Sequence, residues 1–146
     1  MPKFRFSLQT LLRRREDLEQ AARDEMMLRV SRQQQEQQKL EDLKNRRAEN
    51  SAEMAEKQNE DAAYGELIYY RMYLDRLDQE IDNCQRRLVR LRAEVELQRK
   101  VLVEASKKRK TLTSLRDKKE KEFNFAMDKI FQKEIDDIVV LRHKRT

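Results

Sequence analysis

Few residues of this chain could perform chemistry, and none of them has the neighbours that chemistry needs. The only histidine, His143, lies in a basic stretch near the end of the chain, with nothing nearby in sequence to orient it as a general base or metal ligand. The only cysteine, Cys84, permits no internal disulfide and no CxxC metal site. A single glycine excludes a glycine-rich phosphate-binding loop. We therefore expect no catalytic residue, no cofactor and no metal site, and hence no enzyme.

The composition is that of long helices rather than of a globular domain. Charged residues make up 42% of the 146 residues, against about a quarter in an average globular protein. The 34 basic and 28 acidic residues are mostly intermixed, as on a solvated helix face crossed by ion pairs, where nothing shifts a carboxyl pKa towards acid–base work. Disorder has a similar composition, but a disordered chain has no reason to keep a hydrophobic repeat in phase.

Such a repeat runs through the second half of the chain. Its spacing alternates between three and four without a break, through Leu74, Leu77, Ile81, Cys84, Leu88, Leu91, Val95, Gln98, Leu102, Ala105, Arg109 and Leu112. This is a heptad pattern with mostly apolar a and d positions. A stripe this narrow cannot form a globular core and needs a second helix laid along it. The pattern predicts a coiled coil, in which Cys84 acts as a small hydrophobic residue.

The first half of the chain supplies the expected partner helix. Ser7 is its expected N-cap, with Phe6 and Leu11 forming a hydrophobic staple. Its expected seam uses Leu8, Leu11, Leu18, Ala22, Met26 and Val30, and resumes at Leu40, Leu43 and Met54. The amide-rich run 33–38 carries no seam, so we expect this helix to be the weaker partner.

A reversal of the chain is expected around its only glycine, Gly65, because glycine adopts the positive φ of a turn at little cost. The alternative is a glycine tolerated within one continuous helix at about 1 kcal/mol. The expected division is a short extended N-terminus at 1–6, a first helix at 7–58, a turn at 59–66, a second helix at 67–141 and a basic tail at 142–146. The predicted fold is all-α, a long antiparallel two-helix coiled-coil hairpin whose second helix projects beyond the first by roughly 35 Å.

Two groups of apolar residues exceed what the seam needs. Near the turn, Ile68, Tyr69 and Met72 fall at b, c and f positions and Tyr73 at g, which indicates either a protein-binding surface or a hairpin tip that folds back over them. The second group lies on the projecting helix, where no first helix remains to cover it: Phe123, Met127, Ile130, Phe131, Ile135, Ile138 and Leu141. Such a helix end is either frayed or docked into a partner's groove.

Between these groups lies a basic run from Arg99 to Lys121. Arg109 and Arg116 occupy seam positions in it, which should weaken pairing there. The run lacks aromatic residues for stacking on bases, so no nucleic-acid partner is expected. No apolar run approaches the ~20 residues that span a bilayer, and the N-terminus has no secretory signal, so we expect no direct membrane insertion and a cytoplasmic location.

Three stretches resemble the FliJ family, the small coiled-coil proteins of flagellar type III export. They are the opening Lys3-Phe4-Arg5-Phe6-x-Leu8-x-x-Leu11-Leu12 with Arg13 to Arg15 and Glu16, the aromatic segment Tyr69-Tyr70-x-x-Tyr73-Leu74-x-x-Leu77, and the closing Arg109-Lys110-x-Leu112-x-x-Leu115-Arg116 with Glu134, Asp136 and Asp137. The chain length and the two-helix layout are also similar to that family.

The resemblance implies a non-enzymatic stalk, similar to the rotor stalk of rotary ATPases. Its termini would enter the pore of a hexameric export ATPase, and it would contact the cytoplasmic domain of the export-gate membrane protein and could escort export chaperones. These partners would hold it at the cytoplasmic face of the inner membrane. The implied gate-binding residues are Tyr69, Met72, Tyr73 and Leu77. The implied ATPase-binding residues are Arg13, Arg14, Arg15, Lys118, Lys119, Phe123, Met127, Ile130, Phe131, Ile135 and Ile138.

Two other interpretations stay open on the sequence. The stalk protein of a virulence-type injectisome shares this fold and mechanism. A homodimeric structural rod would pair two chains through the seam of the second helix, and the mass in solution distinguishes it from a monomeric hairpin.

Overall fold

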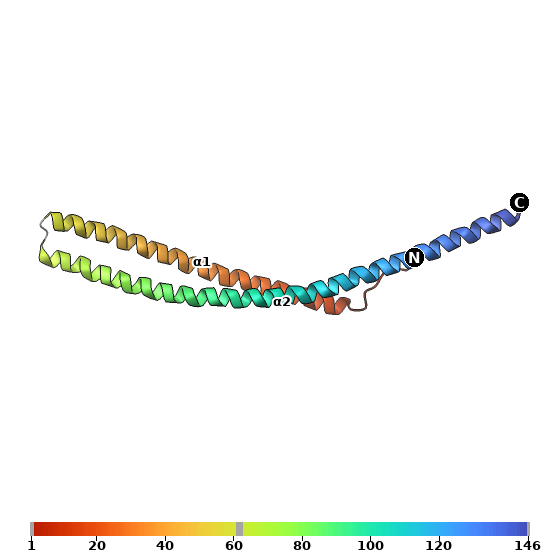
Figure 1. The fold of residues 1–146 in the computed structure, drawn as a ribbon, viewed down its shortest axis with the longest axis horizontal. Helices are drawn as coiled ribbons and strands as arrows, with labels where there is room; N and C mark the ends of the chain where they lie inside the picture. The colour runs from red at the N-terminus through yellow and green to blue at the C-terminus, as the bar shows by residue number, and fades with distance from the viewer. Residues whose placement is uncertain (1, 61–62, 146) are drawn as a thin grey trace. The chain divides into compact units, whose positions relative to one another are not determined.

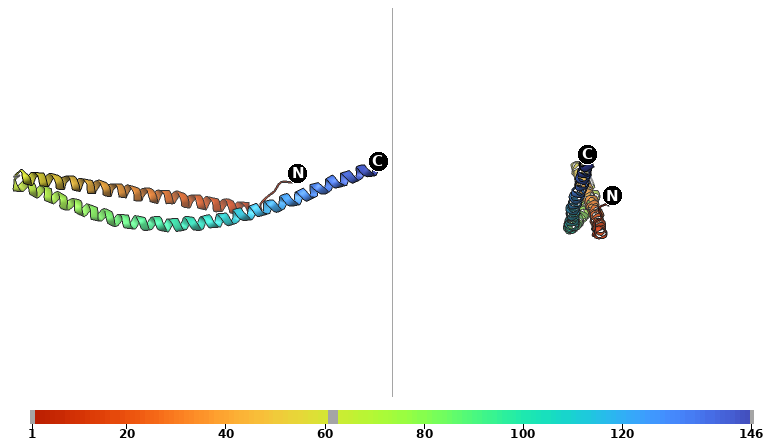
Figure 2. Two further views of the ribbon diagram at one scale, coloured as in Figure 1. Left: turned by 45° about the horizontal axis from the view of Figure 1, so that its top comes forward. Right: turned by 90° about the vertical axis from the view of Figure 1, so that its right-hand side faces the viewer.

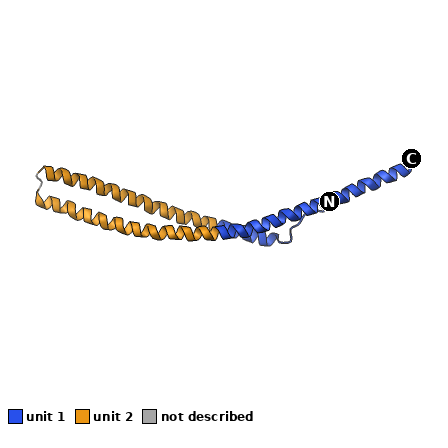
Figure 3. Ribbon diagram, in the orientation of Figure 1, with its two compact units in different colours: residues 1–21, 103–146 blue, residues 22–102 orange. Residues whose placement is uncertain are grey.

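The protein consists of two long helices that pack against each other as a hairpin, and the second is the longer. The computed structural model describes residues 2–60 and 63–145, with α1 at Gln9–Asn59 and α2 at Tyr64–Arg145 (Figure 1). These helices divide into two compact units: unit 1 comprises Met1–Ala21 and Val103–Thr146, and unit 2 comprises Ala22–Leu102 (Figure 3). The predicted all-α hairpin is confirmed.

The α2 seam lies where the heptad pattern puts it. Every predicted seam position from Leu74 to Leu112 is buried or half-buried. In unit 2, where α1 and α2 lie side by side (Figure 2), the apolar core is formed by Leu40, Leu43, Leu77, Cys84 and Leu88, with Ile81 packed against it. These side chains interlock along one narrow line, as a and d residues of a coiled coil do.

The predicted α1 seam is confirmed at Ala22, Met26, Leu40 and Leu43, but it differs in phase at the N-terminal end of the helix. Leu8, Leu11 and Leu18 are exposed, whereas Leu12 is fully buried and Glu19 is also buried. Buried and half-buried α1 residues then recur at spacings of three and four, through Leu12, Arg15, Glu19, Ala22, Met26, Arg29, Gln33, Glu36, Leu40 and Leu43. The seam therefore continues through the amide-rich run that was expected to lack it. The prediction was wrong at these two places because it followed apolar residues alone, while α1 places polar side chains at many a and d positions.

The start of α1 lies one residue later than the expected cap. The first i to i+4 hydrogen bond runs from the Leu12 N–H to the Leu8 C=O at 2.9 Å, and the Gln9 N–H bonds to the Phe6 C=O at 3.1 Å. Leu8 is thus the residue that caps the helix, and Ser7 lies in the turn before it. Burial of Leu12 determines the phase of this helix end, and the capping preference of Ser7 is too weak to oppose it.

The connection between the helices is shorter than expected, and Gly65 lies outside it. The Glu66 and Leu67 N–H groups both donate to the Ala63 C=O, so α2 begins at Tyr64 and Gly65 belongs to its first turn. A Cβ added at Gly65 would meet no atom within 4 Å. Of the expected turn, residues 61–62 lie outside the described residues. At the other end α2 continues to Arg145, so the segment expected as a basic tail is helical there, and its cations suit the negative end of the helix dipole.

Candidate partner-binding surfaces

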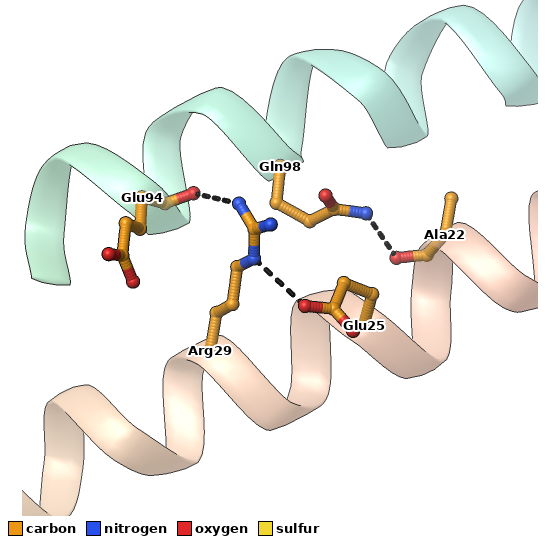
Figure 4. A network of polar contacts seen from close by, with 5 residues as sticks. All are labelled: Ala22, Glu25, Arg29, Glu94 and Gln98. Carbon is orange, nitrogen blue, oxygen red and sulfur yellow. Dashed lines mark hydrogen bonds and ion pairs between the residues drawn. The ribbon is translucent and has the colours of Figure 1, made fainter.

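A network of polar side chains bridges the two helices inside unit 2 (Figure 4). Gln98 is only 6% exposed, and its Nε2 donates to the Ala22 C=O at 3.0 Å. The Arg29 side chain donates to the Glu25 carboxylate at 3.1 Å and, across the seam, to the Glu94 C=O at 3.1 Å. A one-residue slip would leave buried polar groups unpaired, which costs about 1–3 kcal/mol for each group. These contacts therefore select one register of α1 against α2.

A second polar cluster surrounds the buried thiol of Cys84. Arg87 Nε donates to Glu36 Oε1 at 2.6 Å, and Cys84 Sγ lies 3.2 Å from the same oxygen. The hydrogen bond from Arg87 holds the pKa of Glu36 below its ordinary value of 4.5. Burial, followed by the hydrogen bond to Glu36, raises the pKa of Cys84 above its ordinary value of 9.0. The thiol therefore stays protonated at neutral pH and fills the seam rather than acting as a nucleophile.

Unit 1 has its own polar seam contact. Arg109 Nε lies 3.0 Å from the Glu19 carboxylate, and both side chains are mostly buried. Arg109 was expected to weaken the pairing locally. Arg109 pairs with a buried carboxylate of α1, and local weakening relative to an apolar residue stays a prediction, because burying two charges is costly even when they are paired.

The first candidate binding surface is the tip surface, which we define as the outward-facing apolar residues at the start of α2: Tyr64, Ile68, Tyr69, Met72 and Tyr73. Tyr69 is 75% exposed and Met72 is 62% exposed, so neither is covered by a chain that folds back. Leu77, which was predicted to share this surface, is only 2% exposed and belongs to the core. It can hold the helix in place but offers no area to a partner.

The second candidate surface is the C-terminal stripe, defined as Phe123, Met127, Ile130, Phe131, Ile135 and Ile138 of α2. Phe123 and Met127 are half-buried, and every residue from 128 to 145 is exposed. A hollow of about 800 Å³ is lined by Pro2, Phe123, Asn124, Met127, Asp128, Ile130, Phe131 and Glu134. Large apolar side chains spaced along one helix face around a hollow are typical of surfaces that protein partners cover.

The hollow includes a residue from the opposite end of the chain, which the sequence did not lead us to expect. The N-terminal segment, residues 2–6, is not helical and runs beside α2 in unit 1 (Figures 1 and 3). The rings of Phe4 and Phe123 lie 5.7 Å apart between centroids, at an interplanar angle of 50°. The only signal in the sequence was the alternation of Phe4 and Phe6 with Lys3 and Arg5, which suits an extended segment with one apolar side.

The basic charge of the chain is concentrated in unit 1. That unit holds 18 of the 34 Lys and Arg residues and 11 of the 28 Asp and Glu residues, a net charge of +7. Unit 2 holds the other 16 and 17, a net charge of −1. Of the predicted ATPase-binding cations, Arg13, Arg14, Lys118 and Lys119 are exposed, whereas Arg15 is half-buried at a seam position.

The described residues include the tip surface and the C-terminal stripe as groups of exposed apolar side chains. No group of three or more His, Cys, Asp or Glu side chains among them could hold a metal ion. Over the same residues, neither helix contains a stretch long and apolar enough to cross a membrane. The fold and its surfaces define a coiled-coil hairpin that presents apolar patches on its helices.

The sequence assigns this hairpin to a known family. The family model of the flagellar FliJ protein matches residues 4–146, so the chain belongs to the FliJ family. Members of this family are non-catalytic components of the flagellar export apparatus, and the expectation that the chain is not an enzyme is confirmed on that ground. No match was found among curated proteins or among solved structures.

Proposed function

We propose that this protein is a stalk of the flagellar export apparatus, which docks unit 1 into the ring of a hexameric export ATPase and binds the cytoplasmic domain of the export-gate protein through unit 2. It would work in the cytoplasm and be held at the inner membrane only through these partners. The observation that carries the proposal is the C-terminal stripe, a row of exposed and half-buried apolar residues on a helix of a strongly basic unit. Burying each large side chain of the stripe in a groove would contribute roughly 1.5–3 kcal/mol.

The same geometry argues against a rod made of two chains paired through the α2 seam. Leu74, Leu77, Cys84 and Leu88 are already buried against α1 of the same chain. A second chain would have to displace α1 and break the polar contacts at Gln98 and Arg29. We expect a monomer when the mass of the isolated protein is measured by light scattering.

The test of ATPase docking is a pair of truncations. A chain that ends at Lys121 loses the whole stripe but keeps the seam through Leu112, so its helical hairpin should form. A chain that ends at Leu141 loses only the basic last turn and serves as the matched control. We expect the full chain and the control to stimulate a cognate export ATPase and the shorter chain to lose that effect. Equal stimulation by both truncated chains would refute docking through the stripe.

The gate-binding role is tested at the tip surface. Tyr69→Ala combined with Tyr73→Ala removes two exposed rings that lie outside the a and d positions, so the hairpin should fold. We expect weaker binding to the cytoplasmic domain of the gate protein and unchanged ATPase stimulation. Unchanged affinity for the gate domain would remove the tip surface from the proposal.

A further inference from the structure

The N-terminal segment, residues 2–6, lies along α2, and we call it the strap. Phe4 and Phe6 are half-buried, while Pro2, Lys3 and Arg5 are exposed, so the segment turns its rings inward and its cations outward. Pro2 lacks a backbone N–H, which suits a segment that is not helical. Phe4 stacks against Phe123 at the first position of the C-terminal stripe. The strap is therefore continuous with the surface that the proposed function assigns to a partner.

The strap also shapes the hollow beside the stripe. Pro2 lines one side of it, and Phe123, Met127, Ile130 and Phe131 of α2 provide its apolar floor. Its volume of about 800 Å³ falls in the range of pockets that accommodate specific ligands, about 300–1,000 Å³. A bare helix end would offer a convex stripe, whereas the strap and the helix together offer a concavity. Concave, apolar sites hold the anchoring side chains of protein interfaces.

The charges around the hollow indicate the chemistry of its occupant. Asp128 and Glu134 belong to the lining, so an acidic group would be repelled from the α2 side of the hollow. Lys3 and Arg5 are exposed on the strap, and Lys119 is exposed on α2 beside it. A partner that places apolar side chains in the hollow and carboxylates over the strap complements both sides.

We infer that the strap, residues 2–6, is part of the partner-docking site, with Phe4 pinning Phe123 at the mouth of the hollow and Lys3 and Arg5 facing carboxylates of the partner. The occupant is a protein surface with bulky apolar side chains bordered by Asp or Glu residues. This inference rests on the proposed function, because it extends the same docking surface to the other end of the chain.

The test measures binding of the full-length protein to the hexameric export ATPase. Phe4→Ala should weaken binding roughly tenfold, as truncation of an aromatic anchor does in other interfaces. Phe4→Leu keeps an apolar side chain and should restore most of the affinity. Phe125→Ala is the matched control, since Phe125 is exposed, lies outside the hollow and contacts Lys129 instead. Phe4 precedes both helices, so the helical circular dichroism of all three variants should equal that of the parent.

Failure of the inference about the strap can be distinguished from failure of the proposed function. If the parent binds the ATPase and Phe4→Ala binds equally well, the strap is not part of the site and the proposed function is untouched. If the parent itself does not bind, the proposed function fails and the inference fails with it. Lys3→Glu with Arg5→Glu should weaken binding at low salt and much less at high salt, because exposed charges are screened. A salt-independent effect of this pair would overturn the acidic chemistry assigned to the partner.

Discussion

Replacing Gln98 by leucine should stabilise the hairpin, even though it removes a native hydrogen bond. Gln98 is buried, and its Nε2 bonds to the Ala22 C=O at 3.0 Å. Such a bond contributes about 0.5–1.5 kcal/mol net. A leucine buried at the same d position would contribute roughly 1.5–3 kcal/mol. The difference predicts that Gln98→Leu raises the free energy of unfolding by about 1 kcal/mol.

The assay is urea unfolding followed by far-UV circular dichroism. With a slope of about 1–3 kcal/mol per molar urea, the midpoint should rise by roughly 0.5 M with no change in slope. Gln79→Leu is the control, because Gln79 is exposed on the same helix and its replacement should change the free energy by less than about 0.5 kcal/mol.

Stability should rise at the expense of specificity. A polar residue at a core position fixes register and partner number in coiled coils. The Gln98→Leu protein should therefore form dimers at concentrations where the parent is monomeric, which light scattering detects. A Gln98→Leu protein less stable than the parent would refute this reasoning, because the hydrogen bond would then outweigh apolar burial at this site.

Three further predictions follow from the core, the turn and the buried polar cluster. Leu77→Ala should lower the free energy of unfolding by about 2–3 kcal/mol, whereas Leu97→Ala, at a site that is 61% exposed, should change it by less than about 0.5 kcal/mol; equal effects would place Leu77 outside the core. Gly65→Ala should raise the midpoint temperature of thermal unfolding, because the added Cβ meets open space in the first turn of a helix. A lower midpoint temperature would indicate that Gly65 has a turn conformation that alanine does not readily adopt. Stability should be lost at both extremes of pH. The pKa of Glu36 is lowered in the folded protein, so Glu36 stabilises the fold above pH 4.5, and this stabilisation is lost as the pH falls through its pKa in the folded protein. The pKa of Cys84 is raised in the folded protein, so Cys84 stabilises the fold below pH 9.0, and this stabilisation is lost as the pH rises through its pKa in the folded protein. Glu36→Gln should flatten the acid side of a urea-midpoint profile, and an unchanged profile would contradict the assignment.

The two helices differ in how well the sequence predicts them. The α2 seam can be recognised in the sequence because its residues are spaced alternately by three and four positions and few of them are polar. The α1 seam was predicted only in part, because Glu19 and Glu36 occupy seam positions where they pair with Arg109 and Arg87 of the other helix. A sequence displays a polar residue at a core position but not the partner that makes the position acceptable. The prediction therefore placed the apolar residues Leu11 and Leu18 in the seam, where the structure has Leu12 and Glu19.

The surfaces were predicted unevenly for a related reason. Exposure of Tyr69 and of the C-terminal stripe follows from heptad positions and from the unequal helix lengths, both visible in the sequence. Leu77 was assigned to the tip surface through the family resemblance, although its d position already placed it in the core. The strap escaped prediction because the contact of Phe4 with Phe123 joins residues at opposite ends of the chain, and only the register of the whole hairpin brings them together.

The uneven distribution of charge has a kinetic consequence. An acidic surface attracts unit 1, which carries a net charge of +7, and weakly repels unit 2, which carries −1. Diffusional encounters of an acidic partner with unit 1 would therefore be favoured before any contact forms. Under the proposed function, the rate of docking through unit 1 would then depend strongly on salt, whereas the rate of docking through unit 2 would depend on it little.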